Sequence, residues 1–145
     1  MKIVKVHSWV QDLENARPYT IAFKTVSDVR NSFLEITLEN GMVGLGSGNP
    51  SQYVVGESLD MCIKALEPEN LDWLIGRDIR EIDGLLWEAF EKTPINPAAR
   101  AAIDIALHDA FTKYLGIPLH KYLGRKIEKL ATSVTIGIKD VAGTV

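Results

Sequence analysis

The segment from residue 96 to residue 124, NPAARAAIDIALHDAFTKYLGIPLHKYLG, constrains the fold more strongly than any other part of the chain. Apolar side chains recur in it at intervals of three and four residues, which places them on one face of a helix. Asn96 and Pro97 are typical of a helix start, and Gly116 is typical of a left-handed helix end. The side chains on the buried face are Ala99, Ala102, Ile103, Ala106, Leu107, Ala110 and Tyr114. Because most of them are small, we expect a core helix that another element approaches closely.

Alternating apolar and polar residues predict strands in the first third of the chain. Residues 32–39 alternate strictly, and Asn40-Gly41 is expected to form a type I′ turn before a return strand at residues 42–45. Residues 3–10 predict a further strand. The side chains expected on its buried face are Val4, Val6 and Val10. We therefore expect a three-stranded antiparallel sheet with one face to bury.

The rest of the first hundred residues divides into expected loops and helices. Residues 11–30 show neither a strand period nor a helix period, and residues 44–56 are rich in Gly, Pro and Ser, so we expect both as loops. Helical patterns begin near Ser58 and again at Asp78. The core side chains expected from these helices and their connections are Trp73, Ile79, Ile82, Leu86, Trp87 and Phe90.

Three motifs carry a resemblance to a known family. The run Ala102-Ile-Asp-Ile-Ala-Leu-His-Asp, followed by Gly116-Ile-Pro-Leu and Tyr122-Leu-Gly, resembles the signature helix of the mandelate racemase and muconate cycloisomerase branch of the enolase superfamily. Within that branch, the order of the segments is similar to the N-terminal domain of dipeptide epimerases of the Ala-Glu type. The resemblance covers nearly the whole chain.

The resemblance implies an α+β fold in two parts. Residues 1–129 are expected to form a three-stranded antiparallel meander with a helical layer, which is an enolase N-terminal-like capping domain. Residues 130–138 alternate as a strand, and residues 130–145 are expected to supply the first strand and turn of an otherwise absent (β/α)₈ barrel. A complete barrel needs about 250 residues.

The resemblance also implies a reaction. The family members are Mg²⁺-dependent isomerases that remove a proton next to a carboxylate, and we expect dipeptide epimerisation here. Their metal ligands and catalytic acid and base lie in the barrel, so we expect none of them before Val145 and no activity from the 145 residues alone. Muconate cycloisomerase and o-succinylbenzoate synthase are alternatives, because they would share this domain. A free-standing binding or oligomerisation module without activity is an alternative of another class.

Two carboxylates on the signature helix require a separate interpretation. Asp104 and Asp109 are five residues apart, so they project about 140° away from each other and are poorly placed to share a metal. We expect Asp104 to pair with Arg100 one turn earlier, and Asp109 to make a structural hydrogen bond.

The resemblance places substrate-binding residues on two loops, at residues 11–30 and 49–56. Lys24 falls where Ala-Glu epimerases carry an arginine that binds the glutamate side chain, and a lysine keeps the charge without the bidentate fork. We expect this ammonium to favour acidic or neutral dipeptide side chains over cationic ones, the alternative being a solvated lysine. The side chains expected to line an apolar pocket, or else to pack among themselves, are Tyr19, Phe23, Tyr53 and Val55. Thr135 matches a substrate-facing threonine in the epimerases' first barrel strand.

Composition narrows the setting and the partners. A formal net charge of −3 gives no reason to expect nucleic acid or an anionic membrane as a partner. No apolar run approaches the length of a membrane helix, and the first residues lack the apolar stretch of a signal peptide. Cys62 is the only cysteine in the sequence. We therefore expect a cytoplasmic enzyme that acts on a small carboxylate and is a homo-oligomer when full length.

Overall fold

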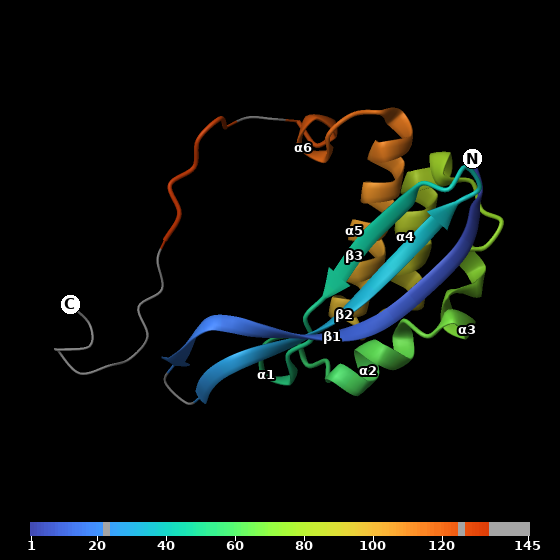
Figure 1. Cartoon of the computed structure of the whole chain (residues 1–145). Helices are drawn as coiled ribbons and strands as arrows, with labels where there is room; N and C mark the ends of the chain where they lie inside the picture. The colour runs from blue at the N-terminus through green and yellow to red at the C-terminus, as the bar shows by residue number, and fades with distance from the viewer. Residues whose placement is uncertain (22–23, 125–126, 134–145) are drawn as a thin grey trace.

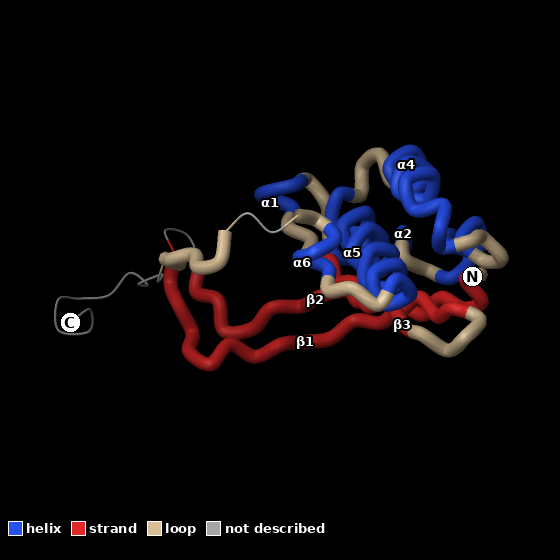
Figure 2. Tube along the Cα trace, turned by 90° about the horizontal axis from the view of Figure 1, so that it is seen from above, coloured by secondary structure: helices blue, strands red, loops and turns tan. Residues whose placement is uncertain are grey.

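The computed structural model describes residues 1–21, 24–124 and 127–133. A three-stranded antiparallel sheet in the order β1-β2-β3 forms one layer, and the helices lie on one face of it (Figure 1, Figure 2). The strands are β1 (Ile3–Ile21), β2 (Lys24–Leu38) and β3 (Val43–Gly48). The expected meander and its helical layer are confirmed.

The helical layer contains one long helix and several short ones. The elements are α1 (Gln52–Val55), α2 (Leu59–Ala65), α3 (Pro68–Leu71), the 3₁₀ turns η1 (Asp72–Leu74) and η2 (Ile79–Glu81), α4 (Ile82–Lys92), α5 (Pro97–Leu115) and α6 (Leu119–Tyr122). Helix α5 begins and ends where the sequence predicts, with Gly116 in the left-handed conformation at its end. None of the helices that the structure describes is both long and apolar enough to cross a membrane.

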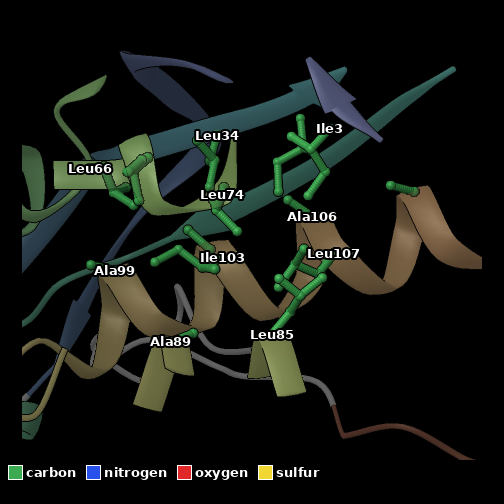
Figure 3. Packing of buried hydrophobic residues seen from close by; sticks show 14 of the residues in the cluster. Ile3, Leu34, Leu66, Leu74, Leu85, Ala89, Ala99, Ile103, Ala106 and Leu107 are labelled. Atoms are coloured by element: carbon green, nitrogen blue, oxygen red, sulfur yellow. The ribbon is translucent and has the colours of Figure 1, made fainter. Parts of the chain in front are cut away.

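The core lies between the sheet and α5, with α4 packed on the far side of α5 (Figure 2, Figure 3). On β2 the side chains of Leu34, Ile36 and Leu38 point inward and are buried. The small face of α5 meets them with six of the seven residues that the sequence predicts and with Ala98, whereas the predicted Tyr114 is only partly buried. These buried α5 residues are Ala98, Ala99, Ala102, Ile103, Ala106, Leu107 and Ala110.

Three glycines on β3 allow the sheet and α5 to approach each other. Gly44, Gly46 and Gly48 alternate along the strand and face α5. A Cβ atom on Gly46 would overlap the carbonyl oxygen of Ala102, and the other two glycines meet α5 carbonyl oxygens in the same way. The expected loop at residues 44–56 is therefore wrong for residues 44–48, because glycine in a strand can mark a place where another backbone comes close.

The connection between β2 and β3 is a tight turn over residues 39–42. Gly41 N–H donates to the carbonyl oxygen of Leu38 at 2.8 Å, and Leu38 N–H donates to Met42 at 2.8 Å. Gly41 has a φ of 82°, whereas Asn40 does not adopt a positive φ. A type I′ turn requires positive φ at both central residues, so that prediction is wrong. The Asn40 side chain instead accepts a hydrogen bond from Met42 N–H at 3.1 Å.

On β1 and α4, some of the buried side chains differ from those that the sequence predicts. The register shifts between Ile3 and Lys5, so Ile3 is buried while Val4 is half exposed. In α4 the buried positions after Ile82 are Leu85 and Ala89, and the expected core residues Trp87 and Phe90 are 64% and 52% exposed. The small Ala89 is the better fit where α4 packs on α5 (Figure 3).

The expected loop at residues 11–30 is a β-ribbon in its described residues, 11–21 and 24–30. The pairing of β1 with β2 continues from Val10 opposite Ser32 to Glu14 opposite Asp28, then shifts register and resumes at Tyr19. This ribbon extends beyond the helices (Figure 1). It lacks the alternating pattern because no helical layer covers either of its faces, so neither face needs to be apolar.

Candidate functional site

Two exposed segments meet the end of the sheet where the ribbon leaves the helices. The first is the ribbon itself, and the second is the loop of residues 49–56 that contains α1. The views place α1 on the helical side of the sheet, at the end from which the ribbon extends (Figure 1, Figure 2). Asn49 Nδ2 donates to Asn31 Oδ1 at 2.5 Å, which joins the loop to the ribbon's base.

Residues 11–30 contain three acidic and three basic residues, and the acidic ones, Asp12, Glu14 and Asp28, lie at described positions of the ribbon. Arg30 donates from Nε and from its second terminal nitrogen to the Asp12 carboxylate, at 2.5 and 2.9 Å. These hydrogen bonds hold the pKa of the Asp12 carboxyl below its ordinary value. Glu14 lies directly opposite Asp28 in the register, two residues further along the same ribbon face, and both are exposed. Like charges placed opposite each other destabilise a strand pair, and the Arg30 guanidinium on this face interacts electrostatically with Asp28 as well as with Asp12.

The α1 turn presents apolar side chains to solvent. Its backbone is held by N–H groups of Val54 and Val55, which both donate to the Ser51 carbonyl oxygen at 3.1 and 2.9 Å. Gly56 ends the turn with a φ of 72°. Tyr53 is 91% exposed, Val54 81% and Val55 43%. A surface of this kind is suited to contact with a ligand or a neighbouring surface.

A buried carboxylate lies immediately after this turn. Glu57 has no exposed surface, and its Oε2 accepts the Ala98 N–H at 2.5 Å. Its Oε1 lies 3.4 Å from Ala99 N and 3.3 Å from Asn96 Nδ2. The start of α5 is thus capped by Glu57 and not by the Asn96 side chain, which makes no capping bond. Sequence reasoning missed Glu57, because its partner is 41 residues away and no local pattern links them.

Cys62 lies near this carboxylate and is buried. Burial raises the pKa of the Cys62 thiol to about 11, and the negative charge of Glu57 adds to the effect. A thiol that stays protonated at neutral pH is a poor nucleophile, so Cys62 belongs to the core and not to a reactive site.

The predicted site residues fall in different parts of the structure. Tyr53 and Val55 lie on the α1 turn. The backbones of Tyr19 and Lys24 belong to the far end of the ribbon, where they pair with Val26 and Ile21. Phe23 and Thr135 lie outside the described residues. Of the strand predicted at residues 130–138, only residues 130–133 are described, and these are outside any helix or strand.

The carboxylates of α5 are structural in the described residues. Asp109 accepts the Leu45 N–H at 2.8 Å and a hydrogen bond from Lys113 at 2.7 Å, so the expected structural role is confirmed. Asp104 lies 3.0 Å from His108 Nδ1, whereas Arg100 lies over the Phe90 ring. The expected pairing of Arg100 with Asp104 is therefore wrong.

The described residues offer a surface for binding and no assembled catalytic centre. Among residues 1–21, 24–124 and 127–133, no three His, Cys, Asp or Glu side chains gather as metal ligands would. The ribbon and the α1 turn can contact and enclose a ligand, and the sheet and α5 support them.

Comparisons with known proteins identify the family of this chain. Residues 4–124 match the model of the mandelate racemase / muconate lactonizing enzyme N-terminal domain. The L-Lys-D/L-Arg epimerase of Methylococcus capsulatus is 45% identical over 99% of this chain, and that of Desulforapulum autotrophicum is 44% identical over 99%. The matches cover 40% and 41% of those proteins, so the chain spans about two-fifths of their length.

The same similarity is present in three dimensions. A dipeptide epimerase from Methylococcus capsulatus, solved with Mg and the dipeptide L-Arg-D-Lys, superposes with a TM-score of 0.94 at 45% identity. The superposition covers 98% of this chain and 40% of that one. The fold described above is therefore that of the N-terminal part of the solved enzyme.

Proposed function

The chain belongs to the mandelate racemase and muconate lactonizing enzyme family, as its N-terminal domain, and on this basis we propose that it is part of a dipeptide epimerase. The observation that carries the proposal is 45% identity to a dipeptide epimerase over 99% of the chain. The reaction removes and returns the proton on a carbon next to a carboxylate. Muconate cycloisomerase and o-succinylbenzoate synthase remain alternatives that share this domain.

We assign this chain the recognition of substrate and not the proton transfer. The ribbon and the α1 turn would cover the reacting centre, exclude water and orient the part of the dipeptide far from the reacting carbon. The described residues do not fit a metal, since they hold no cluster of ligands. Mg²⁺ would stabilise the negative charge that develops on the substrate carboxylate, and we expect its ligands in the part of the relatives' length that this chain does not span.

We propose that the substrate is a cationic dipeptide. The two relatives at 45% and 44% identity are both L-Lys-D/L-Arg epimerases, which argues against the acidic or neutral side chains expected from Lys24. The opposed carboxylates of Glu14 and Asp28 support the proposal, because a cationic side chain near the ribbon would relieve their repulsion. Tyr53 and Val55 would contact the aliphatic stem of such a side chain.

The test is hydrogen exchange at the α-carbon. We would incubate the full-length protein with Mg²⁺ in D₂O and follow loss of the α-proton signal by NMR for Lys-Arg, Ala-Glu and Leu-Tyr dipeptides. We expect the fastest exchange with Lys-Arg. The 145 residues alone serve as a control and should give none. Exchange confined to Ala-Glu would overturn the substrate assignment, and turnover of muconate without exchange in any dipeptide would favour the cycloisomerase alternative.

We also propose a domain division, a compartment and an assembly. Residues 1–129 would form the specificity domain, and residues 130–145 would begin the barrel. A single buried cysteine supports a reducing, cytoplasmic setting. The full-length enzyme is proposed to be a homo-oligomer, which sedimentation of the full-length protein would test.

A further inference from the structure

We propose that Glu57 is a positioning residue that fixes the α1 turn, and with it Tyr53 and Val55, against the start of α5. The inference rests on the proposed function for its effect on catalysis, but its structural part can be tested without it. Glu57 touches no substrate in this scheme; it acts through the turn that does.

The α1 turn lies on the surface of the protein. None of its residues is buried, and its backbone hydrogen bonds run to Ser51 within the same loop. Gln52 Nε2 donates to the Gly56 carbonyl oxygen at 3.3 Å, which is again internal to the loop. The two ends of the loop therefore contribute to the position of the turn relative to the core.

The two ends differ in strength. At the first end, Asn49 and Asn31 form an exposed hydrogen bond between neutral groups, which competes with water. At the second end, Glu57 is fully buried and accepts from the Ala98 and Ala99 backbone and from Asn96. Bonds to a carboxylate are stronger than neutral ones, and the positive end of the α5 dipole stabilises the charge. The Glu57 end is thus the firm attachment.

Glu57 also joins three elements at one point. Asn96 Nδ2 lies between Glu57 Oε1 at 3.3 Å and the Met61 carbonyl oxygen at 3.4 Å, so the loop, α2 and α5 share one network. The start of α5 is itself fixed against Gly48 by the close contact of Ala98. A side chain attached to such a rigid point transmits its geometry to the turn that precedes it.

The substitution Glu57→Gln isolates this role. It keeps the size of the side chain but replaces one acceptor oxygen by an NH₂ donor. Because Ala98 N–H bonds one oxygen while Ala99 and Asn96 face the other, either orientation of the amide opposes a donor to a donor. Asp60→Asn is the matched control: it removes the same charge from an exposed residue three positions away.

Proteolysis tests the structural part in the full-length protein. We expect chymotrypsin to cleave after Tyr53 about fivefold faster in Glu57→Gln, because a loosened turn opens more often. Cleavage after Trp87, on the exposed face of α4, should not change, and neither site should change in Asp60→Asn. An equal increase at both sites would show general destabilisation and overturn the proposal. No increase at Tyr53 would overturn it as well.

Steady-state kinetics tests the catalytic part. For a Lys-Arg dipeptide we expect Glu57→Gln to raise KM about tenfold while kcat changes by less than about threefold, because binding is lost and the chemical step is not. A dipeptide with glycine at the first position, Gly-Arg, should show almost no change in KM, because it lacks the side chain far from the reacting carbon that the turn would contact. Equal loss with both dipeptides, or a fall in kcat alone, would overturn the positioning role. An inactive wild-type enzyme would instead refute the proposed function, and the cleavage at Tyr53 would still decide the role of Glu57.

Discussion

Gly46 in β3 lies so close to Ala102 in α5 that a methyl group on Gly46 would overlap the Ala102 carbonyl oxygen and approach Ala106 N to 2.7 Å. The obstacle is backbone on a buried helix, which has no alternative rotamer and little freedom to move. The contact between β3 and α5 therefore depends on the absence of a side chain at this position.

Substitution of Gly46 by alanine should destabilise the fold. We expect Gly46→Ala to lower the free energy of unfolding by about 3 kcal/mol, because the sheet and α5 must separate to admit the methyl group. Gly84→Ala is the control, since Gly84 lies in α4 with nothing within 4 Å of an added Cβ. That substitution should stabilise by about 0.5–1 kcal/mol. Urea denaturation of both variants measures the difference, and equal effects would contradict the packing argument.

Asp109 should contribute to stability through the edge of β3. Its carboxylate accepts from Leu45 N–H, and Lys113 donates both to Asp109 and to the Val43 carbonyl oxygen. We expect Asp109→Ala to cost about 1–2 kcal/mol of unfolding free energy, because an edge N–H loses its charged partner. Asp104→Ala, on an exposed face of the same helix, should cost less than about 0.5 kcal/mol. If thermal denaturation showed the two variants to be equal, the Asp109 hydrogen bonds would be incidental.

Stability should fall at alkaline pH because of Cys62. The thiol pKa rises from an ordinary value of 9.0 to about 11 in the folded protein, so between these values the folded state holds a proton that the unfolded state releases. A raised pKa of an acid group favours unfolding as pH increases, and we expect a loss on the order of 2 kcal/mol between pH 9 and pH 11. Denaturation midpoints across this range measure it. The slope due to Cys62 should vanish in Cys62→Ala; persistence of the full slope would assign it to other groups.

Substitution of Lys24 tests whether the enzyme prefers acidic or cationic dipeptides. In the full-length enzyme we expect Lys24→Ala to lower kcat/KM for an acidic dipeptide by roughly ten- to a hundredfold, from a lost charged hydrogen bond. It should not lower kcat/KM for a Lys-Arg dipeptide, because removal of a positive charge relieves repulsion. Lys5→Ala, on an exposed part of β1, is the control. A fall of the same size with both dipeptides would place Lys24 in the folding of the ribbon.

Local sequence patterns were sufficient to predict the helices and strands that bury one side against the core. The small face of α5 and the alternation of β2 follow directly from periodicity, because one side of each element is buried. The ribbon at residues 11–30 did not, since a two-stranded ribbon without a covering layer imposes no apolar period. The sequence also did not predict that Gly46 lies in a strand. Glycine is common in loops, and its place in β3 makes sense only once the close approach of α5 is known.

Family resemblance pointed to the segments that carry Lys24 and Tyr53 as substrate-binding, and that assignment stays a prediction. In the structure, the loop with Tyr53 is joined to the base of the ribbon, whereas Lys24 pairs at the far end of the ribbon. Asn96 has the sequence of a helix cap, but the carboxylate of Glu57 occupies that role from another segment. A partner 41 residues away leaves no periodic trace in either segment.

The extension of the β1–β2 pair beyond the helices has a consequence for how the length of the ribbon could vary. The ribbon leaves the core with its pairing in register from Val10 opposite Ser32 to Glu14 opposite Asp28, and the register shifts only beyond that point. Additions or deletions that keep the two strands matched would lengthen or shorten the ribbon without shifting the register that the glycines and alanines fix inside. The outer part of the two strands could thus vary in length while the inner part, which packs on the helices, stays the same.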